Sequence, residues 1–150
     1  MSNLENFEEL KPEIVKPVGI AFNFYEHTKE SFAVCKISGS IPDGSEGKDI
    51  GLYLYQQLTL AIITEEPNAV LVDLRDFTYN YGTAIMQLLD AFSKIKIFGD
   101  DEVLAAFILS EKNKFGIASL CNFDPENPRI PFFTDFEKGY NYLFDLYEKI

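Results

Sequence analysis

Apolar positions recur with two different periods along this chain of 150 residues, and the two periods alternate. Short apolar runs, typical of β-strands, occupy residues 19–25, 32–41, 69–74, 103–109 and 130–133. Between them, apolar residues return every three or four positions, which predicts helices over residues 48–65, 83–97, 111–122 and 135–149. The order β-β-α-β-α-β-α-β-α predicts an α/β fold with a mixed sheet.

The helix ends carry local signals. One face of the first helix is apolar at every fourth residue: Ile50, Leu54, Leu58 and Ile62. Pro67 follows, and proline cannot continue a helix. We expect Thr134 to cap the last helix, because Glu137 stands three residues later and completes a capping box.

The strands differ in their expected surroundings. The polar link 26–31 is short enough to join the first two strands as an antiparallel hairpin at the edge of the sheet. Val70, Leu71 and Val72 form an unbroken apolar run, the pattern of a strand that is buried on both faces. This third strand is therefore expected in the middle of the sheet and parallel to its neighbours.

The chain is expected to form a single domain behind a short lead-in. Residues 1–17 are acidic and include Pro12 and Pro17, so we expect them to be loosely ordered. Residues 18–150 then form one α/β domain, which is the usual count for this length.

Charge and cysteine usage narrow the choice of partner and compartment. Asp and Glu number 24 against 13 Lys and Arg, giving a net charge of −11, which argues against nucleic acid and anionic membranes as partners. No apolar run is long enough for a membrane span or a secretion signal. Cys35 and Cys121 have neither metal-site nor disulfide spacing. We therefore expect a soluble cytoplasmic protein in a reducing compartment.

Few residues in the chain suggest catalysis or metal binding. His27, the single histidine, lies in the polar link, where we expect it to be solvated. The acidic run 100–102 lacks the spacing of a calcium loop. We therefore expect no catalytic residue, no metal site and no cofactor.

Asp73, Arg75 and Asp76 follow the central strand and leave two interpretations open. They could supply an acid, a base or charge stabilisation to a small enzyme. An Asp–Arg pair at a strand end is more typical of a structural ion pair. A cleft beside a carboxyl group with a strongly raised pKa would favour the enzyme.

The segment after the central strand is the candidate interaction surface. We expect residues 73–83 to form the loop at the carboxyl end of that strand, where ligands and partners of α/β sheets usually bind. The partner-binding residues predicted there are Asp76, Thr78, Tyr79, Asn80, Tyr81, Gly82 and Thr83. Exposed tyrosines favour an interface, and a phosphate at this turn would meet a helix N-terminus. The alternative is that Asn80 or Thr83 only caps the helix while the tyrosines pack on their neighbours.

The order of elements and the segment 69–82 resemble the STAS family, which includes anti-sigma-factor antagonists (SpoIIAA-like) and the tails of sulfate transporters. Asp73-Leu74 and Gly82 match the family's strand end and the glycine of its Asp-Ser-Ser-Gly-like turn. In the family, a serine in that turn is phosphorylated to switch binding to a partner kinase. Asn80 and Tyr81 precede the glycine here, and the loop is about two residues shorter than usual.

The resemblance implies a bacterial, non-catalytic regulatory module that binds another protein. The alternative is a carrier of a small apolar molecule or lipid, because Sec14-like lipid carriers are similar in sheet and helix arrangement and the chain has 14 Phe. Those phenyl rings can equally fill a solid core. An open edge strand would also allow two copies to form a homodimer.

Overall fold

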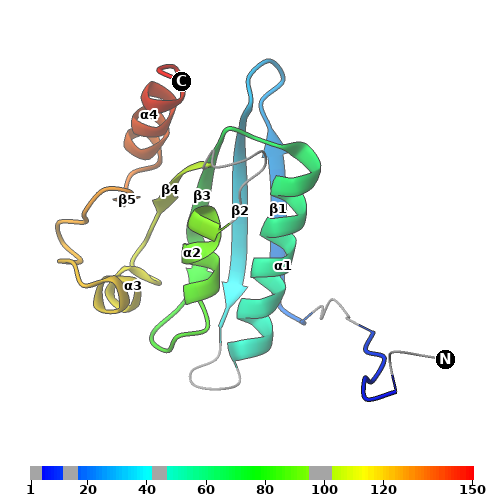
Figure 1. Ribbon diagram of the computed structural model, residues 1–150. Helices are drawn as coiled ribbons and strands as arrows, with labels where there is room; N and C mark the ends of the chain where they lie inside the picture. The colour runs from blue at the N-terminus through cyan, green and yellow to red at the C-terminus, as the bar shows by residue number, and fades with distance from the viewer. Residues whose placement is uncertain (1–4, 12–16, 42–46, 95–102) are drawn as a thin grey trace.

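A computed structural model describes residues 5–11, 17–41, 47–94 and 103–150 of the protein. Its elements follow the predicted order (Figure 1): β1 (Ile20–Glu26), β2 (Phe32–Ser40), α1 (Lys48–Glu65), β3 (Ala69–Thr78), α2 (Met86–Lys94), β4 (Leu104–Ile108), α3 (Lys114–Cys121), β5 (Phe132–Phe133) and α4 (Phe136–Tyr147). The predicted α/β fold is confirmed.

The five strands form one mixed sheet in the order β1-β2-β3-β4-β5. β1 is antiparallel to β2, and every other neighbouring pair is parallel. The hairpin therefore forms an edge of the sheet and β3 its centre, both as predicted. The carboxyl ends of β2, β3 and β4 consequently point the same way and share one end of the sheet.

Side chains that alternate along β3 serve two separate hydrophobic layers. Val70 and Val72 pack in the cluster that includes the buried residues of α1 and α2. Ala69 and Leu71 pack in a second cluster with Leu143 of α4. Because successive strand residues point to opposite faces, α1 and α2 cover one face of the sheet and α4 covers the other. Figure 1 shows α1 and α2 side by side in front of the strands.

Helix α1 has the bounds that the sequence predicts. Its four-residue repeat lies wholly in the core, with Leu54, Leu58 and Ile62 fully buried. The helix ends where Glu66 adopts a left-handed conformation (φ 51°) and donates its backbone N–H to the Ile62 carbonyl at 2.9 Å. Local signals suffice here because the apolar face and both ends are encoded within one segment.

Aromatic rings account for much of the packing on both faces. Phe32 lies among the rings of Tyr140, Phe144 and Tyr147, with centroid separations of 5.2 to 6.0 Å. On the other face, Phe132 stacks between Phe107 and Phe123 at 5.3 and 4.9 Å. The abundant phenyl groups therefore fill the core by packing on one another.

Three predicted helix starts need correction, and one of them is α3, which begins at Lys114 rather than at residue 111. Asp135, not Thr134, caps α4: its Oδ1 accepts from the backbone N–H groups of Glu137 and Lys138 at 2.9 and 3.2 Å. Both residue types can cap a helix, so the sequence leaves a one-residue ambiguity. Helix α2 begins at Met86 rather than at residue 83, because a turn that links Met86 N–H to the Thr83 carbonyl precedes it.

Some predicted features lie partly or wholly outside the described residues. Residues 5–11 of the predicted lead-in are exposed and form neither helix nor strand. Residues 1–4 and 12–16 of the lead-in lie outside the described residues. The end of the predicted second helix and the acidic run 100–102 also lie outside them. Among the described helices, none combines the length and apolar character needed to cross a membrane.

Candidate functional site at the carboxyl end of β3

Strand β3 continues four residues beyond its predicted end. Ser38, Gly39 and Ser40 of β2 pair with Asp76, Phe77 and Thr78. The prediction that residues 73–78 belong to a loop is therefore wrong. The polar side chains resemble a loop in sequence, but β2 is long enough to keep this stretch hydrogen-bonded in the sheet. Asp76 and Thr78 therefore lie on the strand itself and not in a loop.

An irregularity in the pairing explains why two consecutive polar residues face solvent. Lys36 lies opposite Asp73 and Ser38 opposite Asp76, so β3 holds one more residue than β2 between these pairs. Such a bulge shifts the alternation of side chains by one. Leu74 and Phe77 are consequently both buried in the α1 and α2 layer, while Arg75 and Asp76 are exposed.

Asp73 and Arg75 form a two-pronged ion pair on the α4 side of the sheet. The guanidinium donates through Nε and Nη2 to the two carboxylate oxygens at 2.9 and 2.8 Å, and the Arg75 backbone N–H adds a third bond at 3.1 Å. The guanidinium also lies 4.8 Å from the centroid of the Phe136 ring at the start of α4. The structural ion pair expected from the sequence is confirmed.

The pKa of Asp73 moves in the direction opposite to that of a general acid. Burial alone would raise it, but the hydrogen bonds from Arg75 and the charges of Arg75 and Lys36 outweigh burial and hold the pKa below its usual value. Asp76 lies in an exposed ion pair with Lys36 at 3.4 Å. Both carboxyl groups therefore lie in ion pairs with basic side chains.

The two tyrosines of the segment differ in burial. Tyr79 is 1% exposed and sits in the core, whereas Tyr81 is 61% exposed. The Tyr79 hydroxyl donates to the Gly82 carbonyl, and its backbone N–H donates to the Lys112 carbonyl at 3.1 Å. The expectation that Tyr79 is exposed is wrong, because the shifted alternation carries it into the same layer as Phe77. From this buried position, the two hydrogen bonds of Tyr79 hold the loop.

Asn113 fixes the end of β3 from a neighbouring loop. This buried side chain donates its Nδ2 to the carbonyls of Leu74 and Phe77 at 2.6 and 2.8 Å, and its Oδ1 accepts from Ser110 N–H at 3.1 Å. The Ser110 hydroxyl donates to the Arg75 carbonyl at 2.8 Å. Because β3 pairs with β4 only as far as Asp73, side chains that follow β4 satisfy these later carbonyls of β3.

Two glycines let helices approach the loop directly. A Cβ atom at Gly116 of α3 would overlap the Asn80 carbonyl, and one at Gly51 of α1 would overlap the Ala84 carbonyl. Both helices therefore contact the loop backbone, one on each side. The loop backbone is therefore packed against a helix at both of these points.

The solvent side of this loop is a shallow pocket of about 300 Å³. Its walls are residues 79–83 on one side and Gly116, Ser119 and Leu120 of α3 on the other. Asn80, Tyr81 and Thr83 have exposed side chains at its margin. We call residues 76–83 the β3 rim.

The structure brings most of the predicted site residues together at one pocket, but two of them lie outside it. Asn80, Tyr81, Gly82 and Thr83 line the same pocket, whereas Asp76 and Thr78 lie further back along β3. The sequence analysis missed Asn113, Gly51 and Gly116, which shape the rim from other elements. A lone asparagine before a helix looks like an N-cap, although its side chain makes no capping bond here.

No protein-family model matches this sequence, and no curated protein matches it either. The structure is similar to a solved anti-sigma factor antagonist from Mycobacterium paratuberculosis, with a TM-score of 0.60 and 16% sequence identity. The match covers 87% of this chain and 98% of that one. The chain therefore has the STAS-like fold of an anti-sigma factor antagonist.

Proposed function

We propose that this protein is a non-catalytic regulatory module that binds another protein through the β3 rim. The observation that carries the proposal is Tyr81, a large side chain that is 61% exposed on a loop held between two helices. Tyrosine is enriched where proteins bind one another, since it buries much area with few rotatable bonds. The similar solved protein is described as an anti-sigma factor antagonist, which favours a regulatory protein as the partner.

The fixed shape of the rim supports docking. Hydrogen bonds from Tyr79 and Asn113 and the close approach of Gly116 set the loop conformation before any partner arrives. A preformed surface loses little conformational freedom on binding, so more of the contact energy contributes to affinity. Asn80 and Thr83 add polar groups beside Tyr81.

The turn before Gly82 differs from the serine-bearing turn of the STAS family. Asn80 and Tyr81 stand before Gly82, where the family's turn has serines. The Tyr79 hydroxyl is engaged by Gly82, so the side chains of Tyr81 and Thr83 are the hydroxyl-bearing groups of this turn that face solvent. We propose that partner binding does not depend on a phosphoserine at this turn.

The observed chemistry favours docking over the two alternatives. Asp73 and Asp76 are both in ion pairs, and the pKa of Asp73 is lowered rather than raised. The apolar-carrier hypothesis depends on the phenylalanine content, and those rings stack on one another in the core. Neither alternative gains a specific observation.

Affinity capture from the native host tests the proposal. Wild-type protein is compared with the Asn80→Ala/Tyr81→Ala variant and with Tyr25→Ala, which removes a tyrosine of similar exposure whose side chain lies on the opposite face of β1 from Phe24 and Glu26. We expect the rim variant to lose a protein partner that the wild type and Tyr25→Ala both retain. Capture of the same partners by all three proteins would contradict the assignment of the β3 rim.

A further inference from the structure

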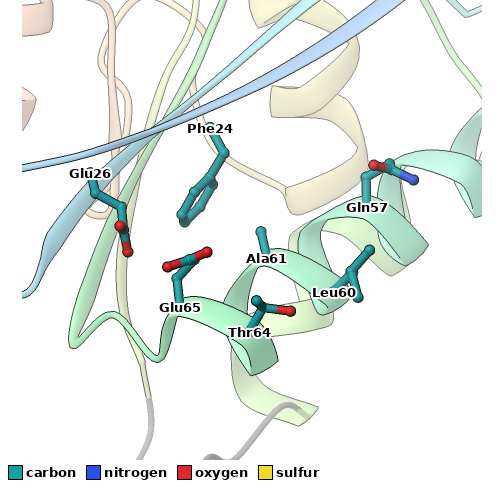
Figure 2. Close-up of a pocket in the computed structure, with 7 residues that line it drawn as sticks. All are labelled: Phe24, Glu26, Gln57, Leu60, Ala61, Thr64 and Glu65. Carbon is teal, nitrogen blue, oxygen red and sulfur yellow. The ribbon is translucent and has the colours of Figure 1, made fainter.

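A second hollow lies on the opposite edge of the sheet, between β1 and α1. It has a volume of about 420 Å³ and is lined by Phe24, Glu26, Gln57, Leu60, Ala61, Thr64 and Glu65. Figure 2 shows the side chains of the edge strand facing those from the last turns of the helix. We call this hollow the β1 groove. None of its residues belongs to the β3 rim.

The strand beside the groove is an open edge. β1 pairs with β2 along all seven of its residues and has no strand on its other side in the described part of the chain. Its sequence, IAFNFYE, contains neither proline nor lysine, the residues that commonly protect edges. Its outer N–H and C=O groups can therefore pair with a further strand.

The groove combines an apolar wall with two acidic side chains. Leu60 is 53% exposed, and it faces the hollow together with Phe24. Glu26 and Glu65 lie at one end, and within the described residues neither forms an ion pair with a lysine or arginine. Desolvation in the groove, followed by the charge of Glu65 and a hydrogen bond with it, raises the pKa of Glu26. The two carboxyl groups repel each other when both are ionised.

The end of α1 adds to this negative potential. Glu65 is its last residue, Glu66 follows, and no basic residue occupies its last turn. The carboxyl end of a helix carries a partial negative charge, which lysine or arginine usually offsets. A cation placed between Glu26 and Glu65 would be attracted by both carboxylates and by the helix end.

We propose that the β1 groove binds an extended segment of a partner protein, which adds a strand to β1 and places a lysine or arginine side chain between Glu26 and Glu65. Apolar side chains of the same segment would cover Phe24 and Leu60. The alternation along β1 supports this arrangement, because Phe24 and Glu26 are two residues apart and point to the same face. This surface is distinct from the β3 rim, so the inference stands apart from the proposed function.

Charge argues against two other occupants. A second copy would bring another chain of net charge −11 to an acidic groove. Antiparallel pairing of two β1 strands about Asn23 would also place Ile20, not a cation, opposite Glu26. The described lead-in residues 5–11 carry Glu5, Glu8 and Glu9 against a single basic residue, so they are a poor electrostatic match.

Nuclear magnetic resonance titration of the full chain with short synthetic peptides tests the inference. The probe is a blocked peptide of alternating valine and arginine, compared with the same peptide carrying citrulline, which keeps the shape of arginine without its charge. We expect the arginine peptide to shift the amide signals of β1 and of the last turns of α1. The citrulline peptide should bind about tenfold more weakly or worse. A version with N-methylated backbone should also lose affinity, because it cannot complete the edge pairing.

Matched variants separate the groove from general electrostatic attraction. Glu26→Gln/Glu65→Gln should weaken the arginine peptide by about tenfold and leave the citrulline peptide unchanged. Glu137→Gln/Glu148→Gln makes the same change in charge at exposed positions of the α4 segment and should alter affinity less than twofold. Equal losses in both variants would overturn the proposal. Signal shifts confined to residues 79–83, or β1 amides already protected in a dimer of the free protein, would also overturn it.

Discussion

The β3 rim and the β1 groove are both surface hollows, but the chain holds them in opposite ways. At the rim, buried groups of Tyr79 and Asn113 fix the backbone, and helices approach through Gly51 and Gly116. At the groove, one wall is an unpaired strand edge and the carboxylates of Glu26 and Glu65 have no cation nearby in the described structure. Contacts within the chain hold the rim backbone, whereas the strand edge at the groove is unpaired in the described residues.

Under the two proposals, this difference corresponds to two modes of recognition. A fixed loop with an exposed tyrosine selects a partner by shape, since its own conformation changes little. An open edge with unbalanced charge selects an extended basic segment, because backbone pairing supplies affinity and the carboxylates select its side chain. Substitutions of the buried residues that hold the rim should therefore lower stability, whereas substitutions in the groove should mainly change affinity.

The largest expected effect is the loss of Asn113. Asn113→Ala leaves the carbonyls of Leu74 and Phe77 without their donor inside the protein. Each unsatisfied buried group costs about 1–3 kcal/mol, so we expect the free energy of unfolding to fall by about 3 kcal/mol in urea denaturation. Asn141→Ala, at an exposed position of α4, should change it by less than about 0.5 kcal/mol. Similar values for the two variants would show that Asn113 does not hold the rim.

A smaller effect is expected from Gly116→Ala. Alanine in a helix interior normally stabilises by up to about 1 kcal/mol relative to glycine. Here the added Cβ would overlap the Asn80 carbonyl, so we expect a net loss of about 1–3 kcal/mol and shifted amide signals at Asn80 and Tyr81. Ser119→Ala, on the exposed side of the same helix, provides the control. A stabilised Gly116→Ala protein would mean that α3 does not press on the loop.

Acid should weaken the Asp73–Arg75 pair. The pKa of Asp73 is lower in the folded protein than the value of about 3.9 for the unfolded chain. Its contribution is therefore complete above that value and is lost as the pH falls through the folded pKa. Because Arg75 is half exposed, we expect Asp73→Asn to cost only about 1 kcal/mol at neutral pH. The difference from wild type should shrink near pH 3, as measured by chemical denaturation at both pH values. A difference independent of pH would contradict the ion pair.

The groove should show the opposite pH dependence, with the smallest effect. The pKa of Glu26 is raised, so its ionised form is disfavoured in the folded protein. Glu26→Gln should slightly raise the melting temperature at neutral pH, because it removes the repulsion from Glu65. The gain should disappear in acid, where wild-type Glu26 is protonated. Glu148→Gln serves as the control, and an unchanged or lowered melting temperature for Glu26→Gln at neutral pH would remove the evidence for repulsion.

Sequence reasoning located the elements well where their signals are local. Helix α1 has its predicted bounds because its apolar repeat and its terminators lie within one segment. The end of β3 was missed because Asp73, Arg75 and Asp76 look like a loop, whereas pairing with β2 keeps them in the sheet. That pairing depends on residues more than thirty positions away in the chain.

The sequence indicates where the β3 rim lies but not how it is built. The rim lies where an apolar strand meets a glycine turn, as the sequence indicates. Nothing local distinguishes Tyr79 from Tyr81: Tyr79 directly follows the end of β3 and continues the buried side of Phe77, whereas Tyr81 lies in the bend beyond it. Asn113 lies 36 residues after Phe77, so its role becomes visible only in the folded chain.

Photo-crosslinking from the β3 rim tests the central claim most directly. Benzoylphenylalanine replaces Tyr81 in one protein and the exposed residue Asp145 of α4 in another, each expressed in the native host. We predict a discrete covalent adduct with a second protein from position 81 and none from position 145. Equal adducts from both positions, or an adduct from position 145 alone, would contradict docking at the β3 rim.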